Sequence, residues 1–141
     1  MRRGYRFTGT WTVDRPVARV YDVLVDLERY PQWWPQVRAV ASLGPDDARV
    51  LCRSTLPYTL DLLLHAVHRD PRLLEVALSG DLEGTVAWRL TDLGERTRLD
   101  LEQEVTVGGW LAVVSPVLGP LLRWNHARMM SGCVDGLRSW A

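Results

Sequence analysis

Two adjacent polar residues near the C-terminus, Asn125 and His126, carry side chains that could do chemistry. Asn125 is the only Asn in the chain and falls on the apolar face of a predicted helix. An unpaired amide there would cost about 1 to 3 kcal/mol, so a core partner such as Tyr58, a buried water or a ligand must satisfy it. His126 lies about 100° further round the helix, where it either borders the apolar face or meets solvent.

An imidazole with a pKa near neutral is a usual acid–base group, so His126 joins Tyr58 and Asn125 as a candidate catalytic residue. The sequence shows no carboxylate that would orient the histidine. Tyr58 follows the inward alternation of one predicted strand and Trp88 that of another, so each either fills the core or lines a cavity. The tyrosine hydroxyl and the indole both need a polar partner when buried.

Trp33 and Trp34 are neighbouring indoles beside prolines, and we expect that they cannot both pack inward. One of them should lie near the entrance of a cavity, either as a lid over a ligand or as a hydrophobic plug on the surface. The spacing alone does not decide which of the two faces inward.

Metal and cofactor chemistry has no support in the sequence. His65 and His68 are three residues apart on a predicted strand, so they point to opposite faces, with His68 inward and His65 at the surface. Cys52 and Cys133 have no metal-like spacing and are expected in the core, which suits a reducing compartment. No motif of a hydrolase, a phosphate-binding loop or a dinucleotide site occurs. We predict no metal site and no cofactor.

The length and the net charge of the chain limit which classes of protein remain possible. A chain of 141 residues with 47% hydrophobic content can bury a core as a single domain, here residues 1–141. Seventeen basic and seventeen acidic residues cancel, so nucleic acid is not an expected partner. The N-terminus lacks the apolar block of a signal peptide, and the apolar stretch Trp110–Leu122 is too short to span a bilayer. We therefore expect a cytoplasmic protein with no integral membrane segment, as monomer or dimer.

The residues above must be positioned by a small set of elements. Residues 5–13 alternate between apolar or aromatic and polar side chains, which predicts a strand. Asp14 and Pro16 open a helix that runs from Pro16 to Leu27 and is ended by Pro31. Residues 30–35 form a second, short segment, in which Pro35 disfavours helical geometry at Trp34.

Between Val37 and Val107 the sequence predicts six strands separated by hairpin-type turns. The alternation is clearest at residues 82–90 and 99–105, where inward residues include Trp88, Leu101 and Gln103. Charged residues occupy the opposite face in the second of these runs. One face of the sheet should therefore meet water.

After Gly108 and Gly109 the apolar residues recur at helical spacing. Pro116 and Pro120 should kink or restart this helix, so its uninterrupted part is predicted from Leu121 to Ser139. Gly132 and Gly136 predict close packing of the helix on the sheet. The expected apolar stripe consists of Leu111, Val114, Leu118, Leu121, Leu122, Asn125, Met129, Cys133 and Leu137.

This order of elements resembles the helix-grip superfamily that includes START lipid-transfer domains, polyketide cyclases and birch-pollen-type allergens. The segments Trp11–Val17, Val20–Asp26 and Tyr30–Val37 are similar to the N-terminal signature of bacterial polyketide-cyclase-like (SRPBCC) members. The resemblance covers nearly the whole chain. It implies an α+β helix-grip fold: a curved seven-stranded antiparallel sheet wrapped around a long C-terminal helix, with two short helices after strand one.

The resemblance also implies a cavity between the sheet and the terminal helix that takes a lipid-, polyketide- or quinone-like molecule, and it brings no universal catalytic motif. The function that we predict first is therefore binding of a hydrophobic or aromatic small molecule. A polyketide aromatase/cyclase and a lipid or quinone carrier acting at membranes are the alternatives. The predicted ligand-binding residues are Trp33, Trp34, Tyr58, Leu62, Trp88, Leu101, Leu121, Asn125 and Met129.

Overall fold

The computed structural model describes the backbone of residues 3–54, 57–107 and 109–140 and the side chains of residues 4–54, 57–107 and 119–140. Seven strands form one sheet in the order β1-β7-β6-β5-β4-β3-β2, and every neighbouring pair is antiparallel. The strands are β1 (Arg3–Val13), β2 (Val37–Ser42), β3 (Asp47–Cys52), β4 (Leu60–Asp70), β5 (Leu73–Gly80), β6 (Leu82–Asp92) and β7 (Thr97–Val107). The curved antiparallel sheet predicted from the sequence is confirmed.

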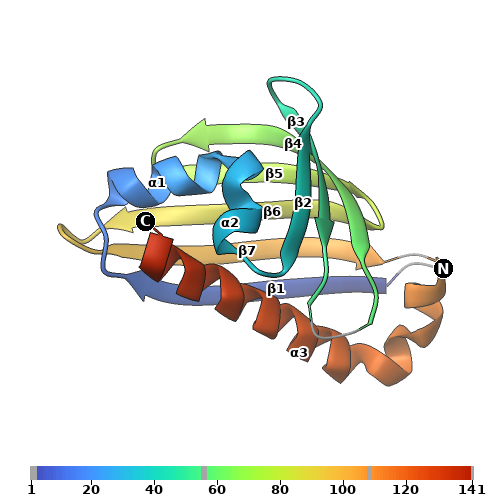
Figure 1. Ribbon diagram of the computed structural model, residues 1–141. Coiled ribbons are helices and arrows are strands. Elements are labelled where there is room, and N and C mark those ends of the chain that lie inside the picture. Colours follow the sequence, from blue (N-terminus) through green and yellow to red (C-terminus); the bar gives the residue numbers. More distant parts are fainter. Residues whose placement is uncertain (1–2, 55–56, 108, 141) are drawn as a thin grey trace.

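The sheet bends so that its two ends face one another. Figure 1 shows β2 and β3 crossing in front of the long strands β5, β6 and β7, while the C-terminal helix runs alongside β1. The concave side thus lies between the sheet and the helices, and residues that alternate inward from every strand meet there.

Strand β7 sets the pattern of the inner face. Its odd-numbered residues from Thr97 to Val107 are buried, whereas the residues between them are exposed or half-buried. Leu101 pairs with Trp88 on β6 and with Gly9 on β1, so one row of inward positions crosses three strands. Two members of this buried set are polar: Thr97, at the start of the strand, and Gln103, with an exposed fraction of 7%.

The connection from β1 to β2 carries the short helices. Helix α1 (Val17–Val25) buries Val20, Val23 and Leu24, the spacing of one helical face, and follows Pro16. A 3₁₀ turn, η1 (Leu27–Arg29), leads into α2 (Tyr30–Trp33), which ends where Trp34 is extended at φ −117° and ψ 97°. This is the geometry that Pro35 was expected to impose on the residue before it.

Helix α3 (Gly109–Trp140) is longer than the sequence predicted. It begins before both Pro116 and Pro120, so the prediction of an uninterrupted helix only from Leu121 was wrong about its start. Figure 1 shows the axis of the first, orange part turning relative to the red part, as expected of prolines that remove backbone donors and bend a helix without ending it. The expected stripe positions Leu111, Val114 and Leu118 lie outside the described side chains.

Two glycines let α3 approach its neighbours, but the partner is not the sheet. A Cβ at Gly136 would lie 2.0 Å from the backbone oxygen of Trp33, and one at Gly132 would lie 1.9 Å from Oε1 of Gln36. The predicted close packing is therefore made against α2 and the residues that follow it. Gly136 presses on backbone that cannot move aside, whereas Gly132 meets the end of a flexible side chain.

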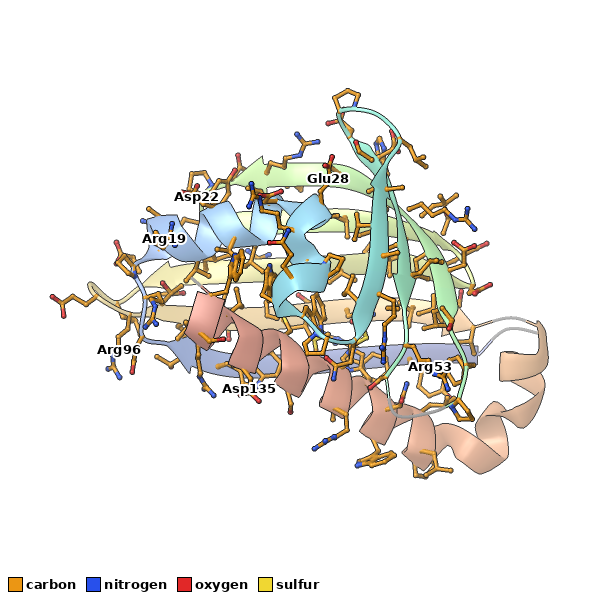
Figure 2. The ribbon with its side chains drawn as sticks, in the orientation of Figure 1. Arg19, Asp22, Glu28, Arg53, Arg96 and Asp135 are labelled. Atoms are coloured by element: carbon orange, nitrogen blue, oxygen red, sulfur yellow. The ribbon has the colours of Figure 1, made fainter. Side chains whose placement is uncertain are left out.

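The outside of the molecule carries the charges. Figure 2 shows Arg19, Asp22 and Glu28 on the helical connection and Asp135 on α3, all directed away from the interior. Exposed ion pairs cover the outer face of the sheet, such as Arg49 with Asp61 at 2.5 Å. Such exposed pairs add little stability, because water and salt screen the attraction between the charges. In the part of the chain that the structure describes, no helix combines the length and apolarity that crossing a membrane requires.

Candidate ligand-binding cavity

A cavity of about 220 Å³ lies between the inner face of the sheet and the helices. Strands β1 and β4 to β7 supply most of its wall, and the rest comes from β2, β3, the helical segment from α1 to Trp34, α3 and the residue Tyr58. Aliphatic and aromatic side chains dominate the lining, among them Leu62, Leu78, Val86, Trp88, Leu101, Val105 and Met129. An apolar space of this size inside a folded protein suits a small hydrophobic guest.

Most of the residues that the sequence singled out border this cavity. The lining includes Trp34, Tyr58, Leu62, Trp88, Leu101, Asn125, His126 and Met129. Trp33 and Leu121 are not part of it. Binding of a ligand by any of these residues stays a prediction.

The two neighbouring indoles are both buried, with exposed fractions of 6% for Trp33 and 8% for Trp34, so the expectation that they could not both pack inward was wrong. The extended backbone at Trp34 turns its indole to the cavity, where Nε1 donates to the backbone oxygen of Met129 at 3.0 Å. Trp33 packs on α3 at Gly136, which has no side chain to displace it. The rings stack with centroids 5.7 Å apart.

Leu121 is exposed, at 45%, and its neighbour Leu122 borders the cavity in its place. Adjacent residues differ by about 100° around a helix, so an error of one position moves a side chain from the inner face to solvent. The residues further along the stripe, Asn125 and Met129, keep the inward direction that the periodicity predicted.

Tyr58 and Asn125 form the first polar pair of the lining, joined by a hydrogen bond between their side chains. Burial raises the pKa of Tyr58, with a further contribution from Cys52, and the hydrogen bond from the Asn125 amide opposes that rise. Asn125 itself is 9% exposed. The core partner that the sequence required for this amide is therefore the tyrosine hydroxyl, and both groups remain at the cavity wall.

His126 and Gln103 form the second polar pair. Nε2 of His126 lies 2.8 Å from Oε1 of Gln103, and the imidazole stacks on Phe7 with centroids 3.8 Å apart and planes 15° from parallel. Burial lowers the pKa of His126 to about 4, with a smaller contribution from the positive charge of Arg123. The ring is therefore neutral at pH 7, and the residue that orients it is an amide and not a carboxylate.

The other two histidines do not chelate. His65 is exposed and its Nδ1 lies 2.8 Å from Oδ1 of Asp47 on β3. His68 was expected to face inward, but a β-bulge between Ala66 and His68 shifts the register, so that His68 pairs with Glu75 and lies exposed at the cavity rim. The extra residue of a bulge changes which side chains point inward beyond it.

Neither thiol is suited to nucleophilic chemistry. Cys52 and Cys133 are free and buried, and burial raises both pKa values, that of Cys52 to about 11. The reactive form of cysteine is the thiolate, which is scarce at neutral pH when the pKa is raised. Among the described residues no group of three His, Cys, Asp or Glu side chains is placed to hold a metal ion.

Sequence reasoning missed several lining residues, of which Phe7, Gln103 and Tyr30 matter most. Gln103 had a usable signal, because it is a polar residue between the apolar inward residues Leu101 and Val105 of the same strand. Tyr30 had none: it lies in the short segment after α1, and its hydroxyl donates to the backbone oxygen of Leu24 on α1, a contact that no sequence periodicity predicts. Burial raises the pKa of Tyr30 above its ordinary value.

Comparisons with known proteins agree with this architecture. The sequence profile of the family described as polyketide cyclase / dehydrase and lipid transport matches residues 5–139. No curated protein matches the sequence significantly.

Several solved structures share the fold at low sequence identity. A START superfamily protein from Mycobacterium smegmatis is 18% identical, with 94% of each chain covered and a TM-score of 0.78. The Zhui aromatase/cyclase from Streptomyces sp. R1128 is 17% identical, with 96% of this chain and 92% of that chain covered and a TM-score of 0.77. The protein TTHA0849 from Thermus thermophilus is 17% identical, with 95% of this chain and 94% of that chain covered and a TM-score of 0.80.

Identities this low establish the fold and carry no substrate with them. The profile match spans all the elements that enclose the cavity, from β1 to α3. On that ground the chain belongs to the polyketide cyclase/dehydrase and lipid transport family, and its fold is the START-like helix grip.

Proposed function

We propose that this protein binds a hydrophobic or aromatic small molecule in the cavity between the sheet and α3. The observation that carries the proposal is the cavity of about 220 Å³ with its mostly apolar wall. Well-packed cores leave few voids larger than a water molecule, so a space of this size is not what packing alone would produce. The two buried free cysteines are consistent with a cytoplasmic setting for this role.

The volume of the cavity limits the size of the guest. An apolar cavity of about 150 Å³ is known to take benzene, so one of about 220 Å³ suits a molecule of about two fused rings. Trp34 and Trp88 border the space and offer ring faces on which an aromatic guest can stack. A naphthalene-sized compound is therefore the right probe.

Equilibrium dialysis with radiolabelled naphthalene tests the proposal. We expect saturable binding of one naphthalene per chain to the wild type. Val86 borders the cavity, and the variant Val86→Phe should put a ring where the guest would lie. We expect it to bind naphthalene at least about tenfold more weakly. Absent or non-saturable binding to a folded wild type would refute the proposal.

A polyketide aromatase/cyclase is a second candidate, because the pairs Tyr58–Asn125 and His126–Gln103 both border the cavity and could polarise a carbonyl. The similarity to the Zhui aromatase/cyclase supports the same reading. The pKa of about 4 at His126 weighs against this residue as a base at neutral pH, since general bases work best near the operating pH. Product analysis after incubation with a poly-β-ketone thioester decides between turnover and binding alone.

A lipid or quinone carrier acting at membranes is a third candidate. Leu121 and Trp124 on α3 are exposed at 45% and 47%, which supports contact with an apolar surface. Co-sedimentation with liposomes tests it, with Trp124→Gln as the variant expected to lose binding. Sedimentation that does not depend on Trp124 would count against this role.

A further inference from the structure

We infer that His126, held in place by Gln103, is a hydrogen-bond acceptor that selects neutral guests carrying a hydroxyl group. The inference rests on the proposed function, since it names which hydrophobic molecules the cavity prefers. It assigns His126 a role in specificity and Gln103 a role in positioning.

Two contacts from different strands fix the imidazole. Phe7 on β1 stacks on one face of the ring at a centroid distance of 3.8 Å, and Gln103 on β7 meets Nε2 at 2.8 Å. Phe7 and Gln103 are cross-strand partners in the β1–β7 ladder, so the sheet presents both to the same side chain of α3. Gln103 is 7% exposed, and its amide cannot turn to solvent without losing this bond.

The contact with Gln103 determines which nitrogen carries the proton. The atom of Gln103 that faces the ring is the carbonyl oxygen Oε1, which accepts, so Nε2 of His126 is the donor. In a neutral imidazole the other nitrogen, Nδ1, then bears a lone pair. Among the hydrogen bonds of the described residues none is to Nδ1, and His126 borders the cavity, so Nδ1 is the atom of the ring that we assign as the acceptor for a guest.

The surroundings keep the ring neutral. Arg123 lies over the rings of Tyr5 and Phe7, with its guanidinium carbon 5.4 and 5.6 Å from their centroids, and its charge disfavours a second cation at His126. The groups that pack on the imidazole from β1 and β7, Phe7 and Gln103, are uncharged. A neutral acceptor of this kind pairs with O–H donors and repels groups that offer only lone pairs.

Carboxylate guests are disfavoured for a separate reason. Arg69 and Glu75 are the charged residues among the described ones that border the cavity. The Arg69 guanidinium is already bonded to Asp46 and to the backbone oxygen of Pro45, and Glu75 is itself an anion. Arg123 does not belong to the cavity wall, so a buried carboxylate would find no free cation there and would pay a large desolvation cost.

Three naphthalene derivatives separate these effects in one dialysis or calorimetry series. 2-Naphthol and 2-methylnaphthalene have nearly the same shape and differ in the hydroxyl, and 2-naphthoate carries a charge. We expect 2-naphthoate to bind at least about tenfold more weakly than 2-naphthol. We also expect the preference for 2-naphthol over 2-methylnaphthalene to fall about tenfold in His126→Phe, because an unpaired buried hydroxyl loses about one decade of affinity.

Controls guard against a variant that merely disturbs the fold. His126→Phe leaves the Gln103 amide without its partner. The same measurement is therefore made on the double variant His126→Phe, Gln103→Leu, in which both partners are replaced by apolar side chains. His65→Phe makes the same substitution at an exposed histidine and should keep the wild-type preference. An unchanged preference in both His126 variants would overturn the inference while leaving the proposed function intact.

Nitrogen-15 NMR of the three histidines gives a second, independent readout. We expect His126 to be protonated at Nε2, and we expect the Nδ1 resonance to shift with 2-naphthol but not with 2-methylnaphthalene. Gln103→Leu should give a mixture of tautomers. A proton on Nδ1 in the free protein, or an Nδ1 shift that is the same for both guests, would contradict the inference. Binding of none of the three compounds would contradict the proposed function itself.

Discussion

The polar residues of the cavity wall are arranged as pairs that satisfy each other, which explains how they coexist with an apolar interior. Tyr58 bonds with Asn125, and His126 bonds with Gln103. Each pair removes most of the cost of burying its members and still leaves hydrogen-bonding capacity at the wall. In the proposed function these residues would orient a guest without placing an unpaired charge in the cavity wall.

The buried imidazole makes stability depend on pH. The folded pKa of His126 is about 4, against 6.5 for an unperturbed histidine, so between these values the unfolded chain binds a proton that the folded chain does not. Stability from this group is complete above pH 6.5 and is lost as the pH falls toward 4, by on the order of 3 kcal/mol.

Urea unfolding of the wild type and of the double variant His126→Phe, Gln103→Leu at several pH values checks this. The wild type should lose stability relative to the variant on acidification. If the unfolding free energies of the two proteins changed with pH in parallel, His126 would have an ordinary pKa in the folded state.

The Tyr58–Asn125 pair predicts a non-additive result. Tyr58→Phe leaves the Asn125 amide without its tyrosine partner and should cost about 1 to 2 kcal/mol of unfolding free energy. Asn125→Leu should weaken ligand binding more than stability, and the double variant should be less destabilised than the sum of the two. Urea titrations measure the stabilities and dialysis measures binding; additive losses would indicate that the two side chains act independently.

At the scale of elements, helix α3 depends on its contact with α2. The Cβ of Gly136→Ala would overlap the backbone oxygen of Trp33, at 2.0 Å, and we expect a loss of about 2 to 3 kcal/mol from this overpacking. Gly132→Ala is the matched control, since it meets only the end of the Gln36 side chain and gains up to about 1 kcal/mol of helix propensity. Equal thermal shifts for both variants would contradict the proposed difference.

The strands were predictable because the pattern of each one is set by its own residues. The alternation in β7 and β6 named the inward face correctly, including Trp88 and Leu101, and the six strands after Val37 are all present. Pro35 likewise predicted the extended geometry of Trp34, since the clash that causes it involves neighbouring residues only.

What the sequence could not reveal depends on contacts between distant elements. The bulge that leaves His68 exposed at the cavity rim arises from the pairing of β4 with β5. Trp33 can be buried beside Trp34 because a glycine far along the chain, Gly136, makes room for it. Helix α3 runs through two prolines that were expected to kink or restart it, so its start lies earlier than the predicted Leu121. The partner of His126, Gln103, lies on a strand that the helix meets only in the folded chain.

At the scale of the whole molecule, the cavity means that the core contains space that larger side chains could fill. Filling it should stabilise the protein, because added apolar contacts replace empty space. We expect Val86→Phe to melt at the same temperature as the wild type or above it while losing naphthalene binding. A variant that both binds and melts like the wild type would place the guest elsewhere, and a strongly destabilised one would mean that the space is already filled.

The central claim, an apolar interior open to a guest of about two rings, is tested most directly by calorimetric titration of the wild type with naphthalene at several temperatures. Burial of the guest predicts one site per chain and a negative change in heat capacity on binding. No heat of binding at any temperature, or a heat capacity change near zero, would contradict it.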